Sequence, residues 1–239
     1  MTITVTLLPI LNDNYCYLIQ SAGKVGLVDP GEAGPVIDYL EKNNLKPDVI
    51  FNTHHHGDHI GGNNALIKRY GCALIGPARE VSRIPGMTKT VSEGDRIEFG
   101  EDVFRVIGTP GHTNGHICFF AEKNHLLFCG DTLFSLGCGR LFEGSAAQMW
   151  NSLQKLMSLP DDTLIYCGHE YTQTNGEFCL SQDPDNADLI ARMEDVKQLR
   201  ENGKPTLPVS LATEKKTNIF LRAGSAEKFK EFRLKKDQA

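Results

Sequence analysis

The stretch Thr53-His54-His55-His56-Gly57-Asp58-His59 places four histidines and one aspartate within seven residues. It contains the pattern His-x-His-x-Asp-His, whose members are His54, His56, Asp58 and His59. Imidazole and carboxylate groups are ligands that suit zinc, iron and related divalent metals. The run lies far from both termini, which argues against an added tag, and a solvated polar loop is the remaining alternative. So many ligand-type side chains together favour a metal site.

The bulk composition is that of an ordinary globular protein. A length of 239 residues fits one large domain, or one domain with a smaller appendage. Hydrophobic residues make up 40% and charged residues 23% of the chain, both typical values. The net charge of -5 argues against a general binder of nucleic acid or of anionic membranes. No apolar run approaches the ~20 residues of a membrane span.

The seven cysteines are odd in number and form no Cys-x-x-Cys pair. This favours free, buried thiols in a reducing compartment over a disulfide framework. The first ten residues lack the basic region and cleavage site of a signal peptide. We therefore expect a cytoplasmic protein, and because nothing in the sequence requires a dimer we expect a monomer.

Apolar periodicity predicts an α/β protein. Strands are predicted over residues 2–8, 15–20, 24–28, 49–51, 96–99, 103–107, 116–120, 126–129 and 163–167. Helices are predicted over residues 34–44, 61–69 and 146–158. Such βα units predict sheets covered by helices on their outer faces. The strand over residues 49–51 leads directly into the histidine run.

The character of the sequence changes near Tyr171. Residues 186–201 carry apolar side chains at helical spacing, and Gly203-Lys204-Pro205 ends that segment. The tail from Ser225 is basic. We predict a catalytic domain over residues 1–171 and a small helical domain over residues 172–239.

Three later segments place a ligand-type residue just after a predicted strand. They are Gly111-His112-Thr113, Gly130-Asp131-Thr132 and Gly168-His169-Glu170. A single histidine in such a place is about as often a half-buried structural residue. Taken with the first cluster, however, the three segments bring the number of candidate ligands to seven. Seven ligands suit two metals that share one of them.

These ordered motifs resemble those of the metallo-β-lactamase superfamily, whose fold is an αββα sandwich of two sheets with helices outside. Within it, the chain is similar to the glyoxalase II (hydroxyacylglutathione hydrolase) family. The segments that carry this closer resemblance are Asp13-Asn14-Tyr15, residues 137–144 (GCGRLFEG), residues 167–172 (CGHEYT) and residues 233–237 (RLKKD).

The resemblance implies a dinuclear centre, with zinc as the expected metal and iron or manganese as alternatives. The ligands of the first metal would be His54, His56 and His112. Those of the second would be Asp58, His59 and His169, with Asp131 bridging both. Asp29, in Val28-Asp29-Pro30-Gly31, either orients ligands from outside or is simply a turn residue.

The resemblance also implies the reaction. Two metals would lower the pKa of a shared water, and the resulting hydroxide would attack a thioester carbonyl. In this scheme Asp58 and Asp131 act as the catalytic metal-binding carboxylates. The expected substrate is S-D-lactoylglutathione, hydrolysed to glutathione and D-lactate in the second step of methylglyoxal detoxification.

Glutathione is an acidic tripeptide, so its carboxylates need cations. The substrate contacts implied by the resemblance are Arg140, Leu141, Phe142, Tyr171, Arg233 and Lys236. On its own, the basic tail is more typical of a solvated helix face. Phe142 stands where some family members have tyrosine, which would remove one hydroxyl contact.

Other functions remain as alternatives. The nearest is a persulfide dioxygenase of the same superfamily, which would use one iron and act on glutathione persulfide. The complete second ligand set favours the hydrolase. A lactonase or β-lactamase would not need the Arg233 and Lys236 pair, and a non-enzymatic scaffold would be expected to lack at least one ligand.

Overall fold

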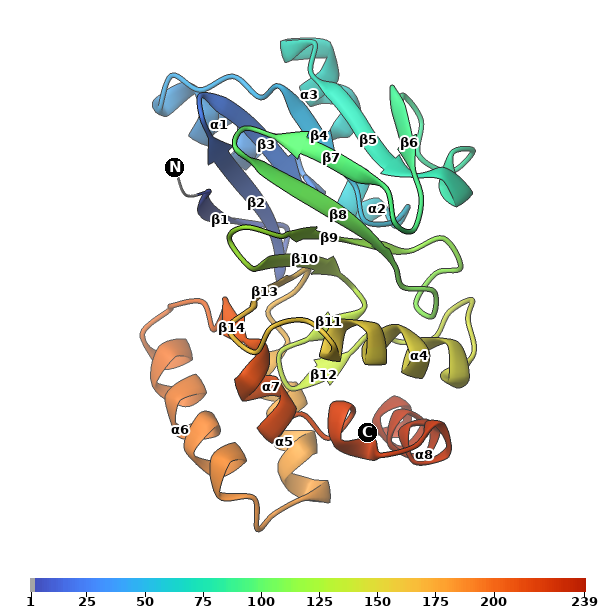
Figure 1. The fold of residues 1–239 in the computed structure, drawn as a ribbon. Coiled ribbons are helices and arrows are strands. Elements are labelled where there is room, and N and C mark those ends of the chain that lie inside the picture. Colours follow the sequence, from blue (N-terminus) through green and yellow to red (C-terminus); the bar gives the residue numbers. More distant parts are fainter. Residues whose placement is uncertain (1–2) are drawn as a thin grey trace. The chain divides into compact units, whose positions relative to one another are not determined.

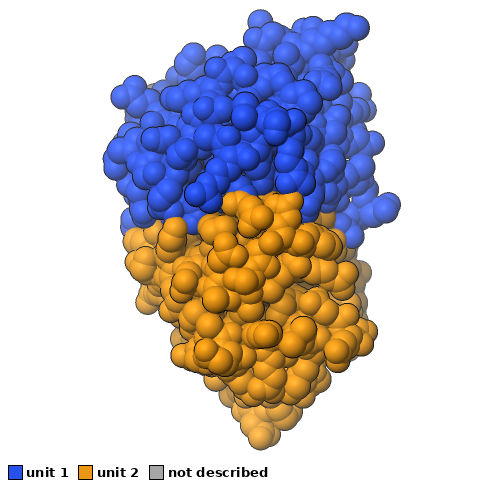
Figure 2. Space-filling model, turned by 90° about the vertical axis from the view of Figure 1, so that its right-hand side faces the viewer, with its two compact units in different colours: residues 1–108, 115–130 blue, residues 109–114, 131–239 orange. Residues whose placement is uncertain are grey.

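The computed structural model describes residues 3–239 (Figure 1). Thr2, the first residue of the first predicted strand, lies outside the described part. The chain forms two compact units, distinguished by colour in Figure 2. The first runs to residue 108 and includes 115–130, and the second comprises 109–114 and 131–239. The predicted domain boundary near residue 171 is a different division and stays a prediction.

The first unit contains a six-stranded mixed sheet with the order β1-β2-β3-β4-β5-β6. Its strands are β1 (Thr4–Ile10), β2 (Asn14–Ser21), β3 (Lys24–Val28), β4 (Val49–Phe51), β5 (Ala73–Pro77) and β6 (Lys89–Val91). β1, β2 and β3 pair in antiparallel fashion. From β3 to β6 the pairing is parallel. Parallel neighbours need crossover connections, and helices α1 (Gly34–Lys42) and α3 (Asn63–Tyr70) supply two of them.

Both helices bury their apolar faces on one side of this sheet (Figure 1). Val36 and Leu40 of α1 join one fully buried cluster with Leu27 and Ile50 of the strands. Leu66 of α3 belongs to the same cluster. Such burial contributes roughly 1.5–3 kcal/mol per large aliphatic side chain. The helices therefore fix β4, whose carboxyl end leads into the histidine run.

The other side of the sheet faces four antiparallel strands of the same unit. These are β7 (Arg96–Phe99), β8 (Asp102–Gly108), β9 (Ile117–Ala121) and β10 (Leu126–Gly130). Phe51 lies between the two layers, with ring centroids 5.8, 5.5 and 5.3 Å from Phe99, Phe104 and Phe119. Edge-on aromatic pairs add about 0.5–1.5 kcal/mol beyond area burial. The first unit is thus layered helix, sheet, sheet.

The helix predicted over residues 61–69 is confirmed as α3, which begins two residues later, at Asn63. A separate short helix, α2 (Gly57–Ile60), was not predicted. Gly61 and Gly62 connect them in close contact with the backbone. A Cβ on either glycine would lie 2.5 Å from a carbonyl oxygen, that of Gly31 or of Pro30. Only glycine allows so close an approach, so the break brings α2 against the Pro30–Gly31 turn.

The second unit combines short strands with most of the helices. Its strands are the hairpin β11 (Leu133–Phe134) and β12 (Gly137–Cys138) and the pair β13 (Leu164–Cys167) and β14 (Val209–Ser210). Its helices are α4 (Ala146–Met157), α5 (Thr172–Gln182), α6 (Ala187–Glu201), α7 (Leu211–Thr217) and α8 (Ala226–Gln238). The helices predicted over residues 146–158 and 186–201 are confirmed. No helix within residues 3–239 is both long and apolar enough to cross a bilayer.

Buried Glu214 of α7 holds the hairpin in place. Its carboxylate accepts hydrogen bonds from the Ser135 hydroxyl (2.9 Å), the Leu136 N–H (2.8 Å) and the Asn218 amide (2.9 Å). Burial raises the pKa of Glu214, although these three donors act in the opposite direction. The segment that follows Asp131 is therefore anchored to α7, through a hydrogen bond between residues 79 positions apart.

Candidate active site

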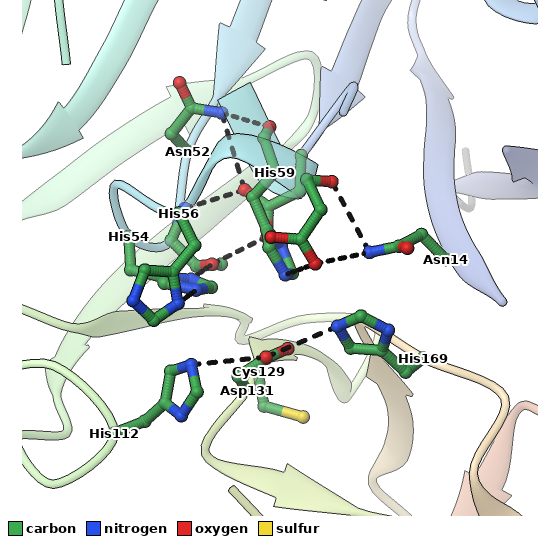
Figure 3. A network of polar contacts seen from close by, with 12 residues as sticks. Asn14, Asn52, His54, His56, His59, His112, Cys129, Asp131 and His169 are labelled. Atoms are coloured by element: carbon green, nitrogen blue, oxygen red, sulfur yellow. Dashed lines mark hydrogen bonds and ion pairs between the residues drawn. The ribbon is translucent and has the colours of Figure 1, made fainter. Parts of the chain in front are cut away.

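The first half-site, His54, His56, Asp58 and His59, follows directly after β4. That strand is buried along its whole length, so the chain leaves the sheet at a fixed point. His54 and His59 are almost completely buried, whereas His56 and Asp58 are half-buried. Asp58 and His59 belong to the short helix α2. The four side chains are thus carried by one strand-to-helix turn, in which Figure 3 labels the three histidines.

Asp29 orients this half-site. Its carboxylate accepts hydrogen bonds from the Thr53 N–H (2.8 Å) and the Thr53 hydroxyl (2.6 Å). Oδ2 also lies 3.0 Å from Nδ1 of His59. Because an ionised carboxylate only accepts, Nδ1 of His59 carries the proton and Nε2 presents its lone pair. The orienting alternative for Asp29, rather than a plain turn residue, fits these contacts.

The same relay fixes His54. The Thr53 hydroxyl donates its hydrogen bond to Asp29, so its oxygen accepts a hydrogen bond from Nδ1 of His54 at 3.0 Å. Nε2 of His54 then carries a lone pair and lies 3.1 Å from Nδ1 of His56. Two nitrogens that both bind the same zinc ion, at ~2.0–2.1 Å, lie about this far apart. The orienting role of Thr53 was not predicted from the sequence, although Thr53 directly precedes His54.

Asn14 holds Asp58. Its side-chain amide donates to Asp58 Oδ2 at 2.9 Å (Figure 3). The backbone of Asp58 is equally constrained, because a Cβ on Gly31 would collide with its carbonyl oxygen. Asn14 lies in one of the segments that carry the family resemblance, yet its contact was not predicted. A hydrogen bond across 44 residues leaves no local sequence pattern.

The second half-site consists of His112, Asp131 and His169, all buried in the second unit. Asp131 lies between the two histidines (Figure 3). Its Oδ2 is 3.3 Å from Nε2 of His112 and 3.4 Å from Nε2 of His169. Nδ1 of His112 donates to the Arg140 carbonyl oxygen at 2.8 Å, so Nε2 is the ring nitrogen that faces the carboxylate.

Aromatic rings and a glycine support this half-site. The His169 ring stacks on Tyr171 with centroids 4.6 Å apart and planes 7° apart. Phe134 lies edge-on to both, 5.8 and 5.5 Å away. A Cβ on Gly139 would collide with the Asp131 carbonyl oxygen. Tyr171, predicted as a substrate contact, therefore lies directly beside a predicted metal ligand.

The other predicted substrate residues fall into two groups. In the first group, Arg140 and Phe142 are largely exposed, and the Phe142 ring lies edge-on to His112 at 5.2 Å.

The second group is more buried. Arg233 is 7% exposed and lines a groove with Leu141. The Lys236 ammonium donates to the Thr174 carbonyl oxygen at 3.0 Å. Burial lowers the pKa of Lys236, and the nearby positive charge of Arg233 lowers it further. The structure brings Arg140 and Arg233 together at Asp237, but pairs Lys236 elsewhere.

The cysteines near the site behave as buried hydrophobes. All seven are free and buried. Burial raises the pKa of Cys138 to about 11 and that of Cys167 to about 12. Since the thiolate is the nucleophile, neither thiol is suited to nucleophilic catalysis near neutral pH.

We expect iodoacetamide at pH 7.5 to modify none of the seven cysteines in the folded protein, and all seven after denaturation. Intact-mass spectrometry reads the number of added groups directly. Rapid modification of Cys138 or Cys167 in the folded protein would contradict their assignment as buried, inert thiols.

The donor set fits a divalent metal. In three of the histidines, His54, His59 and His112, Nδ1 is occupied by an acceptor oxygen, so Nε2 is the remaining ligand atom. Within the first unit, ligand atoms of His54, His59 and Asp29 lie within 4.8 Å of one another. Metal-binding histidines ordinarily show this outer hydrogen bond from the second ring nitrogen. Imidazole and carboxylate donors suit zinc, iron and manganese.

Residues 10–169 match the profile of the metallo-beta-lactamase superfamily, and residues 170–239 match that of the hydroxyacylglutathione hydrolase C-terminus. A hydroxyacylglutathione hydrolase of Rhodospirillum rubrum is 50% identical over 95% of this chain and 89% of its own length. The chain belongs to the hydroxyacylglutathione hydrolase family. The relative of that name from Pelagibacter ubique is 46% identical over 95% of this chain and 96% of its own length.

Solved structures confirm the fold. The crystal structure of ETHE1 from Myxococcus xanthus superposes with a TM-score of 0.73 at 27% identity, covering 98% of this chain and 90% of that one. The chain has the metallo-β-lactamase fold, with mixed sheets and helices, followed by a C-terminal helical domain. It is a thioester hydrolase of this superfamily, and the family membership supports this prediction over the persulfide dioxygenase alternative.

Proposed function

We propose that this chain hydrolyses the thioester of S-(2-hydroxyacyl)glutathione, with S-D-lactoylglutathione as its main substrate. The products are glutathione and a 2-hydroxy acid, here D-lactate. The observation that carries the proposal is the set of oriented histidines, whose Nε2 atoms are left as ligands by hydrogen bonds at Nδ1. The relatives' shared name supplies the substrate class.

Two divalent ions per chain, most simply zinc, are part of the proposal. The proposed ligands of one ion are His54, His56 and His112. Those of the other are Asp58, His59 and His169, with Asp131 shared. Such ions, when bound, lower the pKa of water and polarise a carbonyl oxygen.

The chain's own residues have distinct tasks in this proposal. Asp29 and Asn14 hold His59 and Asp58 in fixed orientations through the contacts described above. Arg140 and Arg233 supply positive charge for the carboxylates of the tripeptide, and a guanidinium matches a carboxylate with two parallel hydrogen bonds. The leaving group is the glutathione thiolate. Because water is the proposed nucleophile, the reaction needs no nucleophilic side chain. This agrees with the raised pKa values of the Cys138 and Cys167 thiols.

The test is direct. Purified protein is incubated with S-D-lactoylglutathione, and glutathione release is followed with a thiol reagent while thioester loss is followed by its ultraviolet absorbance. We expect the two rates to be equal, and we expect chelation to abolish both and zinc to restore them. A protein that holds two metal ions per chain but releases no glutathione would contradict the proposal.

A further inference from the structure

Asp237, in the last turn of α8, bridges two arginines that we propose for substrate binding. Its Oδ1 accepts hydrogen bonds from Nη2 of Arg233 at 2.9 Å and from Nε of Arg140 at 3.2 Å. Arginine stays charged at any physiological pH. The Asp237 carboxylate therefore occupies the place that a bound carboxylate would take between the two guanidinium groups.

The remaining donors of Arg233 show that its carboxylate-binding edge is only half used. Nη1 donates to the buried Cys138 carbonyl oxygen at 2.9 Å. Nε is buried and has no hydrogen-bond partner within residues 3–239. Nε and Nη2 form one edge of the guanidinium, the edge that binds a carboxylate with two parallel bonds. Asp237 takes the Nη2 half alone, so an incoming carboxylate that takes both must displace it.

The pair can be reached from outside the protein. Arg233 and Asp237 line a groove of about 590 Å³, together with Leu141, Lys230 and Leu234. The Asp237 side chain is 30% exposed, in contrast to that of Arg233 at 8%. Asp237 can thus rotate into solvent while Arg233 stays fixed by its bond to Cys138 and by the Phe220 ring below it.

We propose that Asp237 competes with the terminal carboxylate of glutathione thioesters for Arg233 and Arg140, and so sets both affinity and selectivity. The inference rests on the proposed function. A ligand with a carboxylate replaces the Asp237 bonds with its own, whereas a ligand without one cannot. Nη2 of Arg233 thereby keeps an acceptor between turnovers, and thioesters without the terminal carboxylate gain nothing from the arginine pair.

The test measures binding of S-methylglutathione, a stable thioether, by calorimetry in the zinc-loaded enzyme. We expect Asp237→Asn, which keeps the shape and removes the charge, to lower the Kd about fivefold, as expected for a half-exposed ion pair worth about 1 kcal/mol. The KM for S-D-lactoylglutathione should fall by the same factor. With the glycinamide analogue of S-methylglutathione, which lacks the terminal carboxylate, the two proteins should bind equally.

A matched control removes the effect of net charge. Glu231→Gln changes the charge of α8 equally, but Glu231 is exposed and pairs only with Lys228 and Lys235 among the ion pairs seen in residues 3–239. It should leave the Kd unchanged. An equal or higher Kd in Asp237→Asn would overturn the inference, because Asp237 would then support the arginines. The binding readout does not depend on turnover, so an inactive wild type would refute the proposed function alone.

Discussion

Asp131→Ala is expected to lose thioester hydrolysis and most of its bound metal. The Oδ2 atom of Asp131 lies within 3.4 Å of Nε2 of both His112 and His169, so one oxygen serves both histidines of the second half-site. Its removal leaves two imidazoles with no carboxylate between them. Altering a group that merely orients a ligand typically costs 10–100-fold in metal affinity or activity. We expect the loss of a shared ligand to exceed about 100-fold in kcat/KM.

Two measurements check this result. Metal content per chain, read by mass spectrometry after desalting, should fall together with the rate. The control is Asp185→Ala, an exposed aspartate of the same unit, which should keep both metal and rate. Near-normal activity in Asp131→Ala, at any metal content, would show that Asp131 is not the shared carboxylate.

Asp29→Ala is expected to have the second largest effect, although Asp29 is not among the proposed ligands. The substitution leaves the Thr53 N–H and the His59 Nδ1–H without their acceptor, and both lie in the buried interior. Each unsatisfied buried donor costs about 1–3 kcal/mol. His54 loses its fixed tautomer as well, because the Thr53 hydroxyl no longer has a carboxylate to bind. We expect zinc affinity to fall about 10–100-fold and the thermal midpoint of the apo-protein to drop.

The two effects of Asp29→Ala can be separated. Competition with a zinc-binding dye gives the affinity, and a thermal melt without metal gives the stability. Asp29→Asn should be intermediate, because its amide oxygen can still accept from one donor. Asp38→Ala, on the exposed face of α1, serves as the control. If Asp29→Ala bound zinc as tightly as the wild type, the orienting role of Asp29 would have to be abandoned.

Much of the first unit could be predicted from the sequence because its strands have clear local sequence patterns. The strands at Lys24–Val28, Val49–Phe51 and Arg96–Phe99 have the predicted bounds, since each is an apolar or alternating run between turn residues. The position of the histidine run in the fold follows from the preceding strand alone, and that strand is predicted correctly.

The second unit was harder to predict for a physical reason. β11 and β12 have two residues each, too short for any periodicity, and depend on Glu214 from α7. α5 lies in the predicted helical domain, but its bounds were not predicted, since Gly176 is a poor helix former in its middle. A Cβ there would collide with the Met193 sulfur, so the glycine serves the packing between α5 and α6.

The contacts that orient the site residues were not predicted, because they join residues far apart in the sequence. The bond from Asn14 to Asp58 spans 44 residues, and the bond from Arg140 to Asp237 spans 97. A sequence shows which residues are suited to hold a metal or a carboxylate. It does not show which distant residue fixes the tautomer of a histidine or occupies an arginine.

The most direct test is a titration of metal-free protein with zinc, in which S-D-lactoylglutathione hydrolysis is measured at each added equivalent. We predict that the rate rises to a plateau at two equivalents per chain, and that Asp131→Ala shows no such rise. A plateau at one equivalent, or no hydrolysis at two, would contradict a dinuclear thioester hydrolase.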